Sequence, residues 1–382
     1  MSQMYDISRY LKFEQLRLGI GGLYPSRMKR TCLVNLFTIF TYFLTFGQMA
    51  VVINYVLSTT DLMVITEVFL FSMTQIGLIN KLLNFHLKLK NTVILDELIS
   101  REIFAKMTTS EIAILKETLR NCSIGTNLFT ISCCLVVTLY GVFPATENKA
   151  SGKKNYPFPE KFPFNPDNYY VIIYLAEVIT VAVSAWFNGA MDCIFAKHTA
   201  IATSFFSILC EKIKNLLDGI DRKDDKLVEK RIKHCIVYYT EIIRYVSLIE
   251  NTFSYGILVQ FTCSAIVICL TGFQLTLMTN FLSAHFILMA TYFWSMTNQL
   301  TLYCWNGHLL MEKSDEITQA CYHVNWYEMR VNDQKLLITI MERAKQPVAV
   351  KAIGVFCLNL ATLMSILRSS YSYFAVLHQI FS

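Results

Sequence analysis

Seven long apolar blocks constrain this chain more than any other feature. A helix needs about 20 apolar residues to cross a bilayer, and each block is at least that long. The blocks are residues 31–57, 62–83, 124–144, 169–195, 253–278, 281–303 and 347–380. Only 16% of the residues are charged, whereas an average soluble domain has about 25%. The sequence therefore predicts an all-α polytopic membrane protein, in which residues 1–382 form one seven-helix domain within a lipid bilayer.

The basic residues are unevenly distributed among the connecting segments. Segments 1–30, 84–123, 196–252 and 304–346 hold 6, 6, 10 and 5 Lys plus Arg, whereas the segments between and after them hold 4 in all. Because cytoplasmic loops are enriched in Lys and Arg, the N-terminus is predicted to be cytoplasmic and the C-terminus extracellular. A G-protein-coupled receptor has the opposite orientation, which excludes that class. The net charge of +6 is explained by these loops and does not indicate a nucleic-acid site.

Two of the basic segments, 196–252 and 304–346, have a helical pattern. Apolar side chains recur at steps of three and four residues, with Lys, Arg and Glu between them; in the first segment they are Ile232, Ile236, Tyr239, Ile243 and Val246. Such a face packs against other helices. We expect spans four to seven to extend into a cytoplasmic helical layer that is suited to holding subunits together.

The last block, residues 347–382, contains an unusual polar stripe. A single helix over about 35 residues would be about 50 Å long, which is more than the roughly 30 Å hydrocarbon layer requires. Steps of three and four residues connect Ser365, Arg368, Ser372, Val376 and Gln379. Polar groups at membrane depth face protein or water rather than lipid. The stripe is therefore either a tight seam between helices or the wall of a water-filled pore, and its spacing leaves both open.

The sequence offers no pattern for enzyme chemistry. It has no nucleophile elbow, phosphate-binding loop, dinucleotide fingerprint or zinc-protease motif, and no two histidines are spaced as metal ligands on a helix. We therefore predict no catalytic residues, no metal and no cofactor. Two acidic residues, Glu177 and Asp192, lie within span four. Acids inside a membrane tend to be functional. Asp192 is expected near the inner end of the span, facing the cytoplasmic layer, whereas for Glu177 a pocket or outer vestibule and a structural pairing are both open.

A group of aromatic and apolar residues is predicted at similar depth in the outer halves of spans two to five. Small-molecule sites are mostly apolar and aromatic with a few polar groups, here the tyrosine hydroxyls. Each residue alone is also consistent with plain core packing, but together they favour a buried ligand cavity. The predicted ligand-binding residues are Phe69, Phe71, Val137, Tyr140, Tyr170, Ile173, Tyr174, Ile268 and Phe273.

Motifs in the C-terminal third resemble the insect odorant receptor family. They are Tyr303-Cys304-Trp305-Asn306-Gly307-His308, then Ser314, Ala320-Cys321-Tyr322 and Trp326, then Arg343-Ala344-Lys345-Gln346-Pro347, and finally Ser369-Ser370-Tyr371-Ser372-Tyr373-Phe374-Ala375-Val376-Leu377. The match covers about 80 residues, while the rest agrees in span count, orientation and loop lengths. The ending also resembles the gustatory receptors, but Ser372 replaces their Thr and Ile380 separates Gln379 from Phe381, so the odorant branch fits better.

The resemblance implies a function. Members of that family are odorant-gated, nonselective cation channels that require no G protein, in which four subunits surround one pore lined by the seventh span of each. The family pattern favours the pore-wall interpretation, with Ser372 on the wall, Val376 at a hydrophobic gate and Gln379 one turn outward. It implies a small volatile odorant as ligand, contacts between subunits in the cytoplasmic layer, and a location in the dendritic plasma membrane of olfactory sensory neurons.

The family contains a shared co-receptor and many divergent tuning subunits. The co-receptor has a long insertion between spans four and five, and residues 196–252 contain no such insertion. The chain therefore resembles a tuning subunit that assembles with the co-receptor as a heterotetramer. Arg368 departs from expectation because a positive charge in a cation pathway opposes conduction, and an intersubunit contact would remove this objection. The alternatives are a gustatory-type receptor channel and a secondary transporter of a small apolar molecule, although the chain lacks the internal repeats usual in transporters.

Overall fold

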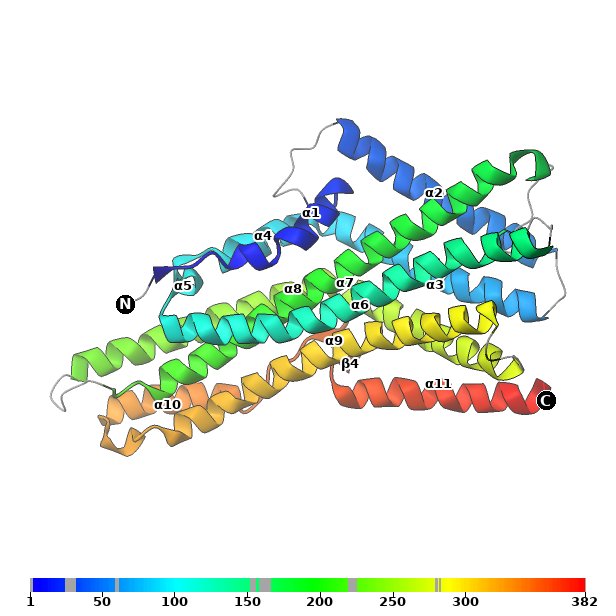
Figure 1. Cartoon of the computed structure of the whole chain (residues 1–382). Coiled ribbons are helices and arrows are strands. Elements are labelled where there is room, and N and C mark those ends of the chain that lie inside the picture. The colour runs from blue at the N-terminus through cyan, green and yellow to red at the C-terminus, as the bar shows by residue number, and fades with distance from the viewer. Residues whose placement is uncertain are drawn as a thin grey trace.

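The computed structural model describes residues 3–24, 32–58, 62–151, 156–157, 166–218, 225–278, 281 and 283–381. Long helices running roughly along one axis dominate the molecule, and the two ends of the chain lie toward opposite ends of that axis (Figure 1). The seven longest are α2 (Cys32–Val56), α3 (Leu62–Leu87), α6 (Thr109–Ser151), α7 (Tyr170–Lys214), α8 (Asp225–Leu277), α9 (Ala284–His323) and α11 (Leu360–Phe381). Each corresponds to one predicted span.

Shorter elements complete the described chain. The helical ones are η1 (Ile7–Tyr10), α1 (Lys12–Ile20), α4 (Leu89–Ile99), α5 (Glu102–Ala105), η2 (Pro166–Tyr169), η3 (Trp326–Glu328) and α10 (Val331–Ala344). The strands form two antiparallel pairs, namely β1 (Gln3–Met4) with β2 (Lys106–Met107), and β3 (Lys351–Ala352) with β4 (Phe356–Cys357). The second pair is a hairpin, and its register places Lys351 opposite Cys357.

Among the described residues, five helices are long and apolar enough to cross a membrane: α2, α3, α6, α7 and α8. The other two long helices, α9 and α11, carry more polar side chains, including Gln299 in α9 and Arg368 in α11. Helices α6, α7, α8 and α9 continue well beyond the predicted block edges. Segments 196–252 and 304–346 are thus largely helical, as their periodicity predicts, with α10 as a separate short helix.

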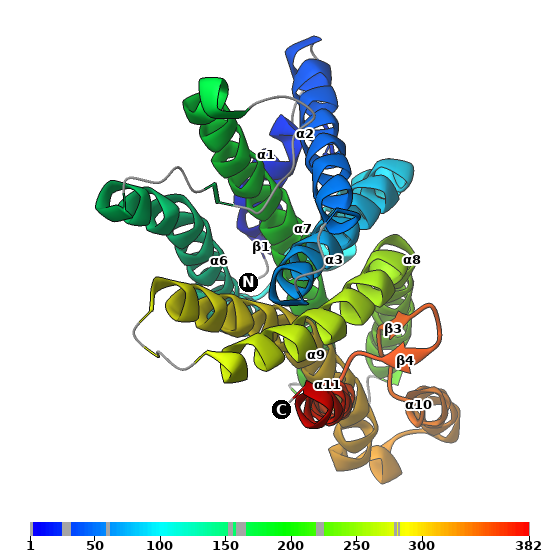
Figure 2. The ribbon, with the colours of Figure 1, turned by 90° about the vertical axis from the view of Figure 1, so that its right-hand side faces the viewer.

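Helix α7 is the centre of the bundle. From Gly189 to Phe206 nearly every side chain is buried, so this stretch is covered on all sides. The preceding part of α7 has many exposed residues, among them Val171 and Ile172. Seen from the end nearest the C-terminus, α2 and α11 lie at opposite edges, with α7 between them (Figure 2). The bundle is therefore tightly packed in one half and more open in the other.

The prediction of one continuous helix from residue 347 is wrong. The β3–β4 hairpin occupies residues 351–357, and α11 begins only at Leu360. The hairpin turns at Ile353 and Gly354, which have φ of 49° and 70°, outside the helical region. The Asn359 side chain then caps α11 by accepting a 2.8 Å hydrogen bond from the Thr362 backbone N–H. The 22 residues of α11 span about 33 Å at 1.5 Å per residue, close to the bilayer thickness.

Candidate functional site

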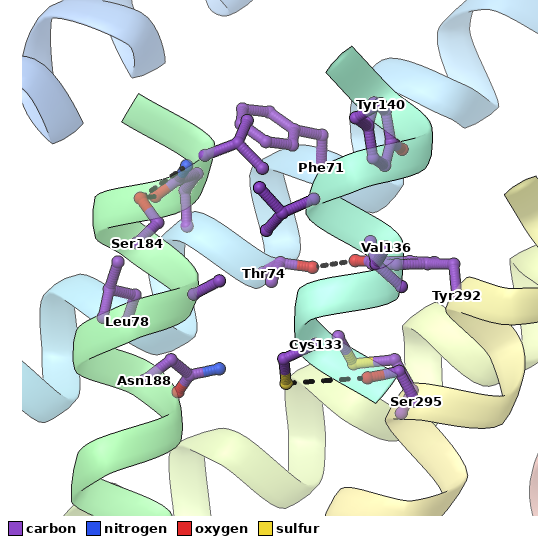
Figure 3. Close-up of a pocket in the computed structure, with 15 residues that line it drawn as sticks. Phe71, Thr74, Leu78, Cys133, Val136, Tyr140, Ser184, Asn188, Tyr292 and Ser295 are labelled. Atoms are coloured by element: carbon purple, nitrogen blue, oxygen red, sulfur yellow. Dashed lines mark hydrogen bonds between the residues drawn. The ribbon is translucent and has the colours of Figure 1, made fainter. Parts of the chain in front are cut away.

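A cavity lies between α3, α6, α7 and α9, on the more open side of the buried part of α7 (Figure 3). Each of the four helices contributes residues one or two turns apart, so that one face of each helix lines the same space. We refer to it as the bundle cavity. Its wall is mainly apolar and is formed by Phe71, Thr74, Gln75, Leu78, Cys133, Val136, Val137, Tyr140, Val181, Ser184, Ala185, Asn188, Tyr292, Ser295 and Met296.

The polar side chains around the bundle cavity are mostly paired with each other. The hydroxyl groups of Thr74 and Tyr292 are hydrogen-bonded across α3 and α9 (Figure 3). Gln75 donates to the Ser184 hydroxyl over 3.4 Å, and the Cys133 sulfur lies 3.8 Å from the Ser295 hydroxyl. Pairing removes most of the cost of placing polar groups in an apolar environment. The bundle cavity therefore presents a largely apolar surface.

Below the bundle cavity lies a buried ion pair. Lys81 Nζ is 2.6 Å from Asp192 Oδ1, and the two side chains are 5% and 0% exposed. The same ammonium donates to Asn188 Oδ1 over 2.7 Å. The Asp192 carboxylate also accepts hydrogen bonds from Gln299 and Tyr303 of α9. Asp192 therefore joins α3, α7 and α9 through three donors, and Asn188 connects this cluster to the cavity floor.

The two acids of span four, Glu177 and Asp192, are both buried in the structure. Asp192 was expected near the inner end, facing the cytoplasmic layer, but it is fully buried and paired with Lys81 inside the bundle. Glu177 is also buried, with 5% exposure, on the outer part of α7. The expectation that Asp192 faces the cytoplasmic layer is thus wrong, because its carboxylate is paired with Lys81 within the bundle.

Three of the nine predicted ligand-binding residues, Phe71, Val137 and Tyr140, line the bundle cavity. Phe69 instead lines a separate cavity of about 340 Å³ between α3, α8 and α11. The other five residues line neither cavity. Whether the three lining residues bind a ligand stays a prediction.

The choice of helix explains only Ile268 and Phe273, which lie on α8. The other four residues lie on α3 and α7, two helices that line the bundle cavity, but outside its wall. Tyr170 and Tyr174 contact each other, with ring centres 5.8 Å apart, and the Tyr174 hydroxyl donates to the Gly141 carbonyl. Ile173 is half-buried on the same part of α7, and Ile268 and Phe273 of α8 are 5% and 1% exposed within the core. The prediction drew on span five, α8, whereas the structure places α9 in the cavity wall.

Sequence reasoning missed the polar residues of the bundle cavity, although α7 carried a signal. Val181, Ser184, Ala185 and Asn188 follow at steps of three, one and three residues, which makes a small and polar helical stripe inside an otherwise apolar span. In the last span, a stripe that includes Ser365 was recognised from steps of three and four residues. The same search in span four would have identified this stripe of α7.

The polar stripe of α11 is not covered by any part of the chain that the structure describes. Ser365, Arg368, Ser372, Val376 and Gln379 are all exposed. The opposite side packs on the bundle, where Leu363 is 8% exposed and the Ser370 hydroxyl donates to the Ala265 carbonyl of α8 over 3.1 Å. A seam between the stripe and another helix of this chain is thus ruled out for these residues.

No cluster of three or more His, Cys, Asp or Glu side chains suited to a metal ion occurs among the residues that the structure describes.

Comparison with known proteins identifies the family. The family model for the 7tm odorant receptor matches residues 61–371. Odorant receptor 10 of Aedes albopictus is 25% identical over 252 residues, which cover 65% of this chain and 65% of that protein. Odorant receptor 13a of Drosophila melanogaster is 24% identical over 276 residues, which cover 66% of this chain and 65% of that protein. The chain thus matches slightly less than two thirds of the length of these relatives.

Solved structures show the same fold. The insect olfactory receptor OR5 from Machilis hrabei, in complex with eugenol, has a TM-score of 0.86 and 14% identity, with 98% of each chain covered. Another structure of that receptor has a TM-score of 0.83. The seven-helix membrane fold is thereby confirmed. The relatives are odorant receptors and not enzymes, in agreement with the prediction that the chain is not an enzyme. Because the family model covers most of the sequence, this chain belongs to the 7tm odorant receptor family.

Proposed function

We propose that the chain is a subunit of an odorant-gated, nonselective cation channel. The observation that carries this proposal is the exposed polar stripe of α11, which lies outside the bundle while the ligand cavity lies within it. A polar helical face at membrane depth requires water or protein beside it. Several copies of α11 arranged around an axis would meet that requirement by enclosing a water-filled path.

The bundle cavity is the proposed ligand site. Its volume is about 80 Å³, smaller than the roughly 150 Å³ engineered cavity that holds benzene. A volatile molecule of about ten non-hydrogen atoms would therefore have to displace lining side chains. Phe71 suits this role because it is only partly buried, and Met296, although buried, has a flexible side chain. The expected ligand is a small, mainly apolar odorant.

Gating is proposed to occur at Val376, with Ser372 and Gln379 on the pore wall. Val376 is 53% exposed, so its side chain is available to neighbouring copies of α11. A ring of valines makes a narrow, dewetted constriction, and moving it outward admits hydrated cations. The described stripe contains no acidic residue, so weak selectivity among Na⁺, K⁺ and Ca²⁺ is expected. A ligand shifts this equilibrium only by binding the open state more tightly than the closed state.

The assembly is proposed to be a heterotetramer with the shared odorant receptor co-receptor, in the dendritic plasma membrane of olfactory sensory neurons. The N-terminus would be cytoplasmic, and the basic ends of α7, α8 and α9 with α10 would form the layer between subunits. Exposed apolar residues on these elements, such as Val237, Tyr322 and Ile338, fit such contacts. Arg368, also exposed, would contact a neighbouring subunit rather than face the cation path.

The test is whole-cell current from cells that express the chain with and without an insect co-receptor, while G-protein signalling is blocked. The expected result is a fast, nonselective cation current that needs both subunits and a volatile ligand. Current from this chain alone would show that the co-receptor is not required, and the channel proposal would stand. Surface-expressed complexes that stay silent toward ligands shown to bind them would refute the channel proposal.

A further inference from the structure

The Asn188 side chain is the exception among the polar groups of the bundle cavity. Thr74, Gln75, Cys133 and their partners are engaged with one another. Asn188 uses its Oδ1 to accept from Lys81, but its Nδ2 makes no hydrogen bond within the described part of the chain. The amide nitrogen points from α7 into the space enclosed by the other three helices (Figure 3). Two N–H donors therefore face the cavity.

The contact with Lys81 determines which of the two Asn188 amide atoms, Oδ1 or Nδ2, faces the cavity. An ammonium group has three donors and no acceptor. Rotating the Asn188 amide by half a turn would place its NH₂ group against Lys81 Nζ, where the oxygen now lies at 2.7 Å. Lys81 is in turn held by the Asp192 carboxylate at 2.6 Å. The ion pair thus keeps the oxygen turned away from the cavity and the two N–H groups turned into it.

We propose that Asn188 donates a hydrogen bond from Nδ2 to a carbonyl oxygen of the ligand, so that the bundle cavity selects small ketones, aldehydes and esters. The inference rests on the proposed function only in taking this cavity as the ligand site. Asn188 would contact the ligand, whereas Lys81 and Asp192 are positioning residues. An alcohol fits less well, because its hydroxyl hydrogen needs an acceptor as well, and the hydroxyl groups of the described lining would have to accept it in addition to their contacts with one another and with Gln75 and Cys133.

The expected preference follows from a single hydrogen bond in a mainly apolar site. A neutral hydrogen bond contributes enough to tighten binding by roughly three- to tenfold, and covering the partly buried Asn188 donors with a ligand that lacks an acceptor leaves them unsatisfied, which penalises that ligand. The remaining contacts are with apolar side chains such as Val136 and Leu78, which do not distinguish a carbonyl oxygen from a methylene group of similar shape.

The experiment compares isosteric probe pairs on the purified, full-length receptor complex. Acetophenone is paired with α-methylstyrene, and 2-heptanone with 2-methyl-1-heptene, because each pair exchanges C=O for C=CH₂. Binding is measured as ligand-induced thermal stabilisation at graded probe concentrations, which gives an apparent Kd independently of gating. We expect the carbonyl member to bind roughly three- to tenfold more tightly in at least one pair. If neither carbonyl probe binds more tightly than its isostere, whether or not either binds, the inference is overturned.

Two variants test whether Asn188 causes the preference for carbonyl probes. Asn188→Leu removes the donors at similar size, and the carbonyl preference should disappear. Val137→Ala enlarges the same cavity without touching a polar group, so both members of a pair should shift together and the preference should remain. Retention of the preference in Asn188→Leu would overturn the inference. Should that variant fail to fold, 1-phenylethanol on the wild-type complex gives a second criterion: it must bind more weakly than acetophenone.

Current recordings with the same probes separate this inference from the proposed function. If carbonyl probes bind more tightly but a complex at the cell surface gives no current, recognition by Asn188 is supported and the channel proposal is refuted. Current that is evoked equally by both members of each pair would keep the channel and overturn the recognition.

Discussion

The buried Lys81–Asp192 pair allows a quantitative prediction about stability. Asp192→Asn preserves the shape of the side chain but removes the charge that faces Lys81, whose side chain is 5% exposed. At 2.6 Å the attraction is about 6 kcal/mol at an effective dielectric constant of about 20. Breaking a buried pair by removing one partner typically costs about 3–5 kcal/mol, because the remaining charge is uncompensated.

The hydrogen bonds around Asp192 indicate which change, Asp192→Asn or Lys81→Met, destabilises the protein more. Both carboxylate oxygens accept, one from Lys81 and Tyr303 and the other from Gln299. An asparagine replaces one of these oxygens by an NH₂ group, which would then oppose a donor. By contrast, Lys81→Met leaves Asp192 with Gln299 and Tyr303 as donors. We therefore expect Asp192→Asn to be the more destabilising change, and the double variant Lys81→Met with Asp192→Asn to regain part of the loss.

The assay is thermal unfolding of the detergent-purified protein, followed by fluorescence-detected gel filtration. A loss of about 3–5 kcal/mol corresponds to a fall in Tm of roughly 4–6 °C for a chain of this size. Glu241→Gln is the matched control, since its partner Arg101 is 45% exposed at 3.0 Å, and a surface pair contributes at most about 1 kcal/mol. A double variant as unstable as Asp192→Asn, or equal losses from the two single variants, would refute this reasoning.

Four further predictions concern α9, the β3–β4 hairpin, the last helix and Tyr140 of the bundle cavity. Gly307→Ala should destabilise the protein by about 1–3 kcal/mol in the same assay, because the new Cβ would lie 2.6 Å from Leu358 Cβ. Ile353→Gly should stabilise it by about 1 kcal/mol by removing a β-branched side chain at a φ of 49°; an unchanged or lower Tm would contradict this. Val376→Ser should give a ligand-free leak current that Ala375→Ser does not. Tyr140→Ala should change the rank order of ligands in current recordings, whereas Tyr174→Phe, outside the bundle cavity, should leave the order unchanged.

The number and class of the helices could be predicted because hydrophobic length is a strong and local signal. Each of the seven apolar blocks corresponds to a long helix, including the spans that continue past the block edges. The prediction for the last block failed only in its first part, where a mainly apolar stretch that begins at Lys351 forms the β3–β4 hairpin. Apolar composition does not distinguish a strand from a helix in so short a run. Gly354 and Asn359 were the available signals for a turn and a helix cap.

The position of the bundle cavity could be predicted less well, because it depends on which helices are neighbours. The sequence placed aromatic residues at a similar depth, and Phe71, Val137 and Tyr140 do meet there. Composition could not show that α9 rather than α8 closes the cavity, since both helices carry aromatic residues at suitable positions. Lys81 and Asp192 are 111 residues apart in the chain, so a helical period cannot predict that they pair.

A continuous path of packed side chains connects the cavity floor to the start of α11. The Tyr303 hydroxyl donates to Asp192, its ring meets Phe261 edge-on at 5.7 Å, and Phe261 stacks on Phe356 of β4 at 5.3 Å. Side chains in a close-packed interior cannot move independently, so a displacement of Asp192 has to be accommodated along this path. The Thr362 hydroxyl of α11 donates to the Cys357 carbonyl at the end of the hairpin. The hairpin, with its unfavourable turn at Ile353, is thus a direct physical link between the bundle cavity and the last helix.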